Sequence, residues 1–184
     1  MRSAVFEFGE ESATADRRQS HRSSWSTSAT RIAIGVAALG IGILVYLLDR
    51  RPEHTYFLAR IGVTHALAEG ASPVFGMWSQ NLPAFLHVFA FTLITGGILA
   101  CGKTGSLVVA LGWFATDVAF EASQKFPAWF DRLIPPWFDT LPILESDRTY
   151  FRFGTFDVLD VIAIAIGAMA AYALLVLTSE GRQP

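Results

Sequence analysis

Four runs of apolar residues divide the chain, and polar sequence that often contains glycine or proline separates them. The runs cover residues 32–48, 82–101, 107–120 and 158–177. A helix needs about 20 apolar residues, within a range near 17–25, to cross the hydrocarbon core of a bilayer. The third run reaches this length once the polar residues down to Gln124 are counted as its end. The pattern therefore predicts an all-α membrane protein with four transmembrane helices, over about 32–48, 82–101, 106–122 and 158–178.

The segments outside these runs complete the predicted organisation. Residues 1–30 are rich in Ser, Thr and Arg, which predicts a flexible polar tail because such a segment cannot bury enough apolar area to offset its ordering entropy. Residues 31–178 form the transmembrane domain, and residues 179–184 form a polar C-terminal tail. Apolar residues at helical spacing in residues 58–69 predict a short helix at the membrane interface. Residues 125–156 contain many aromatic residues and prolines. This composition predicts a long aromatic loop that lies in the headgroup layer or partly re-enters the membrane.

Composition supports a membrane protein and excludes some other classes. The 184 residues are 52% hydrophobic and only 16% charged, and the mean hydropathy is +0.41. A soluble domain of this length carries more charge. The net charge of −2 does not favour a nucleic-acid partner. The single Cys101 excludes an intramolecular disulfide framework and a cysteine-rich metal site.

Basic residues do not decide the orientation in the membrane. With the N-terminus inside, seven basic residues lie on each side of the bilayer, so the positive-inside rule favours neither direction. We expect a cytoplasmic N-terminus because the polar tail has no export signal. The arginines at positions 17, 18, 22 and 31 suit a membrane interface that contains anionic lipid.

Polar and ionisable residues within or beside the last three runs all fall toward one membrane face. Antiparallel neighbours place the start of the second run, the end of the third and the start of the fourth at the same face. Spacings of three and four residues put the members from each helix on one side of it. Charged groups are costly in lipid and usually face a protein interior or a wet cavity. The sequence thus predicts one polar pocket formed by His87, Asp117, Glu121, Gln124, Asp157 and Asp160.

Three interpretations of this pocket follow from its residue types. The first is a hydrogen-bond network that holds the helices together or recognises a ligand. The second is a site for proton handling or catalysis. The third is a site for a divalent metal. We favour the first and predict no metal and no cofactor. No nucleophile with a matching base is visible, which favours a role other than that of an enzyme.

Small residues repeat every four positions in the fourth run, at Ala163, Gly167 and Ala171. Small residues at this spacing let helix backbones approach closely. We expect this face to pack within the chain rather than to form a homodimer.

At these residues the chain resembles the VanZ-like family of small polytopic membrane proteins. The family has a His near the start of one span with an aromatic residue four positions later, here His87 and Phe91. It has E-x-x-Q at the end of the next span, here Glu121 to Gln124, and an Asp with a Gly seven positions later in the last span, here Asp160 and Gly167. The order and spacing agree over about residues 82–175. The resemblance implies a membrane protein of the bacterial cell envelope, located in the inner membrane.

These observations predict an integral envelope protein whose polar pocket recognises a lipid or another envelope ligand. One alternative is a non-catalytic accessory or scaffold subunit of a larger membrane complex, contacted through the N-terminal tail and the aromatic loops. A second alternative is a membrane enzyme that acts on a lipid-linked substrate. Membrane lipids are the expected partners in each case.

Overall fold

The computed structural model is all-helical in the residues that it describes, which are 3–49, 74–126, 128, 132 and 156–179, with side chains described from Ser26 onward. The elements are α1 (Ser3–Asp49), the 3-10 helix η2 (Gly76–Ser79), α3 (Leu82–Ile98), α4 (Lys103–Lys125) and α7 (Val158–Leu177). The interfacial helix predicted at 58–69, most of the aromatic loop predicted at 125–156 and nearly all of the C-terminal tail lie outside the described residues.

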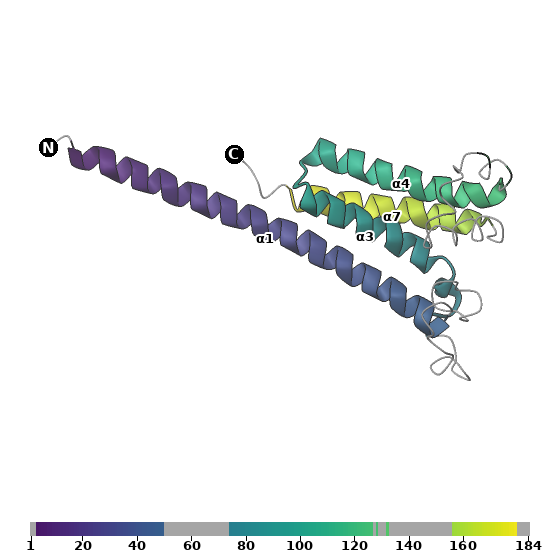
Figure 1. Ribbon diagram of the computed structural model, residues 1–184. Helices are drawn as coiled ribbons and strands as arrows, with labels where there is room; N and C mark the ends of the chain where they lie inside the picture. Colours follow the sequence, from purple (N-terminus) through teal and green to yellow (C-terminus); the bar gives the residue numbers. More distant parts are fainter. Residues whose placement is uncertain (1–2, 50–73, 127, 129–131, 133–155, 180–184) are drawn as a thin grey trace.

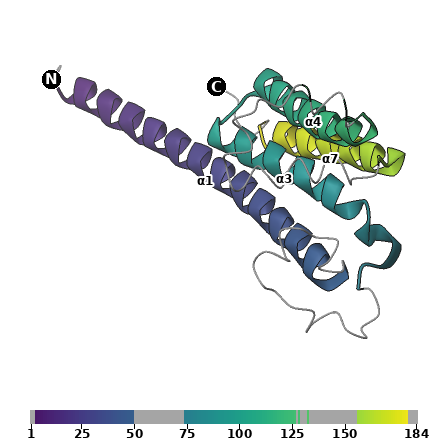
Figure 2. The same ribbon diagram turned by 45° about the vertical axis from the view of Figure 1, so that its right-hand side comes forward.

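Helices α3, α4 and α7 lie side by side, and α1 runs obliquely along α3 (Figures 1 and 2). Helix α3 packs against each of the other three long helices. Helices α1 and α4 run in one direction, and α3 and α7 run in the other. We call the end at which α1 and α4 finish and α3 and α7 begin the loop end. The opposite end, which holds the connection between α3 and α4, is the turn end.

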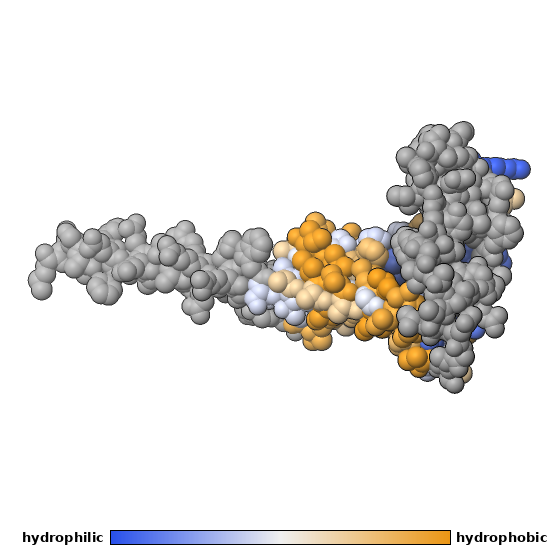
Figure 3. Space-filling model, turned by 60° about the horizontal axis from the view of Figure 1, so that its bottom comes forward, coloured by the Kyte–Doolittle hydropathy of each residue, from blue (hydrophilic) through white to orange (hydrophobic). Residues whose placement is uncertain are grey.

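Three of these helices are long and apolar enough, by length and composition, to cross a membrane. They are α4, α7 and the part of α1 from Ser26 to Asp49. Helix α3 is apolar but has only 17 residues. Large apolar side chains point outward, and Val36 and Ile43 of α1 are 56% and 59% exposed. Figure 3 shows a broad hydrophobic surface over the middle of the molecule. The prediction of a helical membrane protein is confirmed to this extent, and the crossing of the bilayer by α3 stays a prediction.

Close backbone contacts hold α3 between α1 and α7. A Cβ atom added to Gly35 of α1 would lie 2.8 Å from the carbonyl oxygen of Ala90. One added to Gly167 of α7 would lie 2.6 Å from the carbonyl oxygen of Phe85. Glycine at such positions lets two helix backbones approach more closely than a larger residue allows. The packing of the bundle therefore depends on the absence of side chains at these two contacts.

The small-residue repeat predicted in the fourth run lies on α7. Gly167 contacts α3 as described, and Ala171 is fully buried in a cluster with Leu93 and Leu175. Ala163 is only partly buried. Two of the three repeated positions thus contribute to packing within the chain.

Helix α3 ends in a left-handed cap. Ala100 has a φ of 48°, and the N–H groups of Ala100 and Cys101 donate to the carbonyl oxygens of Gly97 and Gly96. This is the double hydrogen-bond pattern of the Schellman motif, which usually has glycine at the left-handed position. The turn is so short that α4 begins at Lys103, two residues after Cys101.

Helix α1 extends through residues that the sequence predicts as a flexible tail. Its backbone is helical from Ser3, and its N-terminal half stands clear of the other helices (Figure 1). The flexibility expected for residues 1–30 stays a prediction. Adding residues to an existing helix avoids the unfavourable nucleation step, so a polar segment next to a stable span can continue it without a core of its own.

Arg31 of α1 caps the C-terminal end of α7. Only 1% of the residue is exposed. Its Nη2 donates to the carbonyl oxygen of Leu175 and to Ser179 Oγ, and its Nε donates to Thr178 Oγ1, all at 2.8 Å. The sequence predicts Arg31 at the membrane interface with the other arginines, and its depth in the membrane stays a prediction. The last carbonyl groups of a helix attract a cation, which explains why a buried arginine is accommodated here.

At the loop end, Asp49 ties the end of α1 to the segment before α3. Its two carboxylate oxygens accept hydrogen bonds from the backbone N–H groups of Val74 and Phe75, each at 2.8 Å. Helix α1 is therefore fastened at both ends of its span, by Arg31 at the turn end and by Asp49 at the loop end.

Candidate functional site

Helix α4 brings two carboxylates into the bundle at the loop end. Asp117 and Glu121 are four residues apart and thus lie on one face of the helix. They are 6% and 7% exposed, although much of α4 is exposed. A buried carboxylate is stable only when it is paired or accepts hydrogen bonds. The partners of these two residues therefore define the site.

Asp117 pairs with His87 of α3. The His87 Nδ1 atom lies 2.9 Å from Asp117 Oδ2, and the carboxylate, as the acceptor, places a hydrogen on Nδ1. The side chain of His87 is 49% exposed, in contrast to 7% for Asp117. The carboxylate fixes the orientation of the ring, and any further chemistry of His87 falls to Nε2.

Two aromatic side chains support the imidazole. The ring of Phe91 meets that of His87 edge to face, with centroids 4.6 Å apart, and stacks on Trp113 at 4.7 Å. Trp113 Nε1 donates to Thr95 Oγ1 at 3.0 Å, which fixes the indole between α3 and α4. These contacts limit the rotation of His87 from the side away from Asp117.

Glu121 joins α4 to the start of α7. Its Oε1 accepts a hydrogen bond from the backbone N–H of Asp157 at 2.7 Å, and its Oε2 accepts one from Gln124 Nε2 at 3.2 Å. The carboxylates of Asp157 and Asp160 lie near enough to repel that of Glu121 electrostatically. Glu121 is therefore held by hydrogen bonds in an acidic environment.

Asp157 and Asp160 organise the first turn of α7 together with Asn81. Asp157 is the N-cap, and its Oδ1 accepts a hydrogen bond from Leu159 N at 2.9 Å. Asn81 Nδ2 donates to Asp160 Oδ1 at 2.8 Å and to Asp157 Oδ2 at 3.4 Å. Asn81 directly precedes α3, so one amide links the starts of two helices.

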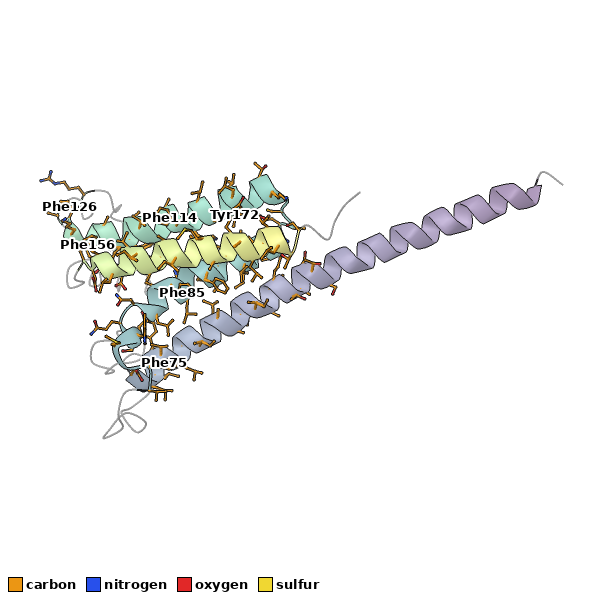
Figure 4. The ribbon with its side chains drawn as sticks, turned by 180° about the vertical axis from the view of Figure 1, so that it is seen from behind. Phe75, Phe85, Phe114, Phe126, Phe156 and Tyr172 are labelled. Carbon is orange, nitrogen blue, oxygen red and sulfur yellow. The ribbon has the colours of Figure 1, made fainter. Side chains whose placement is uncertain are left out.

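The loop end also holds a cation near this cluster. Lys125 Nζ, in the last turn of α4, lies 5.1 Å from the ring centroid of Phe156. Figure 4 shows Phe126 and Phe156 at the same end of the bundle, where α4 finishes and α7 begins. The cluster around Glu121, with its four carboxylates, one histidine and one lysine, has an excess of hydrogen-bond acceptors.

The structure brings the six predicted residues to one end of the bundle, where they form hydrogen bonds in different pairs. His87 bonds to Asp117, whereas Glu121 bonds to Gln124 and to the backbone of Asp157. The sequence analysis did not identify Asn81. Its position just before a predicted span, on the same membrane face as the carboxylates, is the signal that could have shown it. Within the described part of the chain, no three His, Cys, Asp or Glu side chains form a group that could hold a metal ion.

Comparison with protein-family models, curated proteins and solved structures gives no match for this chain. The resemblance to the VanZ-like family therefore stays a prediction based on the motifs of the sequence.

Proposed function

We propose that this chain is an integral membrane protein of the cell envelope that recognises a lipid headgroup or another envelope ligand at the loop end. The observation that supports this most directly is the pair of buried carboxylates, Asp117 and Glu121, which α4 brings into the bundle at the loop end. A network that served only to hold the helices together would not require such an excess of acidic groups. Ionisable groups within membrane segments commonly mark functional sites.

The composition of the cluster indicates the chemistry of the ligand. Ionised carboxylates accept hydrogen bonds and donate none. A headgroup with ammonium or hydroxyl donors suits such a site better than one that carries only phosphate. His87 adds one group that can donate or accept through Nε2, since its Nδ1 is engaged with Asp117. Recognition accounts for these residues without a nucleophile, which catalysis by covalent attack would require.

The test is to identify the lipids that copurify with the full chain. The wild type and the variants Asp117→Asn and Glu121→Gln are extracted gently in native nanodiscs, and bound lipids are compared with the bulk membrane by mass spectrometry. We expect the wild type to be enriched in a lipid with a donor-bearing headgroup, and both variants to lose this enrichment. The matched control is Thr116→Val, because Thr116 lies beside Asp117 but is exposed and bonds to Gly112 of its own helix. A wild-type lipid profile equal to that of the bulk membrane would refute the proposal.

A further inference from the structure

The short segment before α3 exposes large apolar side chains at the loop end. Met77 and Trp78, both in η2, are 83% and 72% exposed, and they are the two most exposed large apolar side chains in the described part of the chain. Val74, just before η2, is 65% exposed. Exposed apolar residues that gather in this way usually mark a surface that contacts lipid or a protein partner.

Two sets of hydrogen bonds fix where this segment lies. Asp49, which directly follows the first apolar run, accepts hydrogen bonds from the N–H groups of Val74 and Phe75. Figure 4 shows Phe75 beside the end of α1. On the other side of η2, Asn81 donates to Asp160 near the start of α7. The segment is therefore held level with the end of one span and the beginning of another.

The length of α3 indicates the depth of η2 in the membrane. With 17 residues and a rise of about 1.5 Å per residue, α3 is about 26 Å long. The hydrocarbon core of a bilayer is about 30 Å thick. When α3 crosses the membrane, the residues next to its ends lie at the boundary between the hydrocarbon and the headgroups. Trp78 precedes the first residue of α3 by four positions, so it belongs to this boundary at the loop end.

The composition of the segment fits this boundary better than it fits water. Residues 74–86 contain no Asp, Glu, Lys or Arg. Tryptophan combines a large apolar ring with one N–H donor, and it is enriched where hydrocarbon meets headgroups. Ile43 and Leu44 of α1 are 59% and 48% exposed, so the exposed apolar surface of α1 reaches to within about two turns of Asp49. The apolar side chains of η2 thus continue a surface that lipid covers.

We infer that η2 inserts Met77 and Trp78 into the lipid interface of the leaflet at the loop end. The inference rests on the membrane insertion in the proposed function but not on the nature of the ligand. It also gives the candidate site a depth. Asn81 follows η2 closely and bonds to Asp157 and Asp160, so the acidic cluster lies level with the headgroups. A lipid of the same leaflet can then present its headgroup to the site.

The experiment measures the quenching of tryptophan fluorescence in the full chain, reconstituted in phosphatidylcholine nanodiscs. The difference between the wild type and Trp78→Phe reports on Trp78 alone, and phenylalanine keeps an apolar ring at this exposed position. Three quenchers are compared: lipid brominated near the glycerol end of its acyl chains, lipid brominated near the chain ends, and iodide in the water. We expect Trp78 to lose most fluorescence to the first, less to the second and least to iodide.

The control adds a tryptophan in the middle of the first apolar run with Ile41→Trp. Ile41 is 44% exposed on α1, so its replacement should be quenched mainly by lipid brominated near the chain ends. Quenching of Trp78 by iodide but not by brominated lipid would place it in water and overturn the inference. Quenching by none of the three would mean that protein covers it, which also overturns the inference. If brominated lipid failed to quench the tryptophan at position 41, the membrane insertion itself would be refuted.

Discussion

Arg31 in α1 donates a hydrogen bond to the carbonyl oxygen of Leu175, in the last turn of α7, across 144 residues of sequence. This contact places a buried cation against the negative end of a helix dipole, where the free carbonyl groups of the last turn need donors. It also joins α1 to α7, although α3 lies between much of their length. The contact therefore helps to fix the angle at which α1 leaves the bundle.

Replacing Arg31 should destabilise the bundle. Arg31→Ala removes the hydrogen bonds to Thr178 Oγ1, Ser179 Oγ and the carbonyl oxygen of Leu175, and it removes the buried cation from the end of α7, so we expect a loss of about 1–3 kcal/mol in the free energy of unfolding. Denaturant-induced unfolding in mild detergent measures this loss. Thr30→Ala is the control, because Thr30 is exposed and its hydroxyl bonds to the carbonyl oxygen of Ser26 in its own helix. Equal stability of the Arg31 and Thr30 variants would show that the cap contributes little.

The contact between α7 and α3 should not tolerate a side chain at Gly167. In Gly167→Ala the new Cβ would lie 2.6 Å from Phe85 O and 2.6 Å from Val88 Cγ1, so the two helices must separate. We expect a loss of about 1–3 kcal/mol, as for other overpacked cores.

Gly112→Ala provides the opposite result as a control for the Gly167 variant. Gly112 is an exposed residue within α4, and a Cβ there meets nothing within 4 Å. Because alanine favours a helix over glycine, we expect a gain of up to about 1 kcal/mol. Thermal unfolding of both variants in the same detergent gives the comparison, and a stable Gly167→Ala protein would contradict the close approach of α7 and α3.

Two residues with positive φ should respond in opposite ways to exchange between alanine and glycine. Ala100 has a φ of 48° and Gly76 a φ of 54°. The left-handed conformation costs an L-residue roughly 1–2 kcal/mol and costs glycine nothing. Ala100→Gly should therefore stabilise the protein by about 1 kcal/mol, and Gly76→Ala should destabilise it by a similar amount.

A Cβ at Gly76 meets no atom within 4 Å, so the backbone alone determines the effect of Gly76→Ala. The shift of the unfolding midpoint measures both variants. A destabilised Ala100→Gly protein would mean that Ala100 does not occupy the left-handed conformation.

The apolar runs predicted where the long helices lie, because lipid acts as an apolar solvent and the length of a run sets the length of a span. They did not predict the partners of the polar residues, which depend on the rotation of each helix about its own axis. The axial position of α4 matters as well, because Asp117 and Glu121 share one face and lie about 6 Å apart along the helix, and the sequence does not specify which of them meets His87. The contact of Arg31 with α7 was not predicted for a related reason, since its position at the start of a run suits both an interface and a helix cap.

Local rules also missed two features that depend on neighbouring structure. Ala100 occupies a position where glycine is expected, so the sequence offered no signal for the end of α3. The helical extension before Ser26 has a composition typical of disorder, and only its continuity with the span makes it helical. Asn81 was also missed, although it is a polar residue beside a predicted span, and its contacts with Asp157 and Asp160 follow from the pairing of α3 with α7.

The hydrogen bonds of Glu121 predict that the shape of its side chain and its capacity to accept hydrogen bonds contribute separately to the stability of the protein and to ligand binding. Glu121→Leu introduces an apolar side chain of similar size. It removes the carboxylate oxygen that accepts the hydrogen bond of the Asp157 N–H at 2.7 Å. We expect it to lower the free energy of unfolding by about 1–3 kcal/mol. Glu121→Gln keeps one carbonyl oxygen that can accept the same bond, so its loss should be smaller. Ligand binding through the carboxylate, in contrast, should be lost in both variants. Unfolding in detergent and lipid analysis of the same samples separate the two effects. If Gln and Leu at this position reduced stability equally, the bond to Asp157 would not be what holds the start of α7.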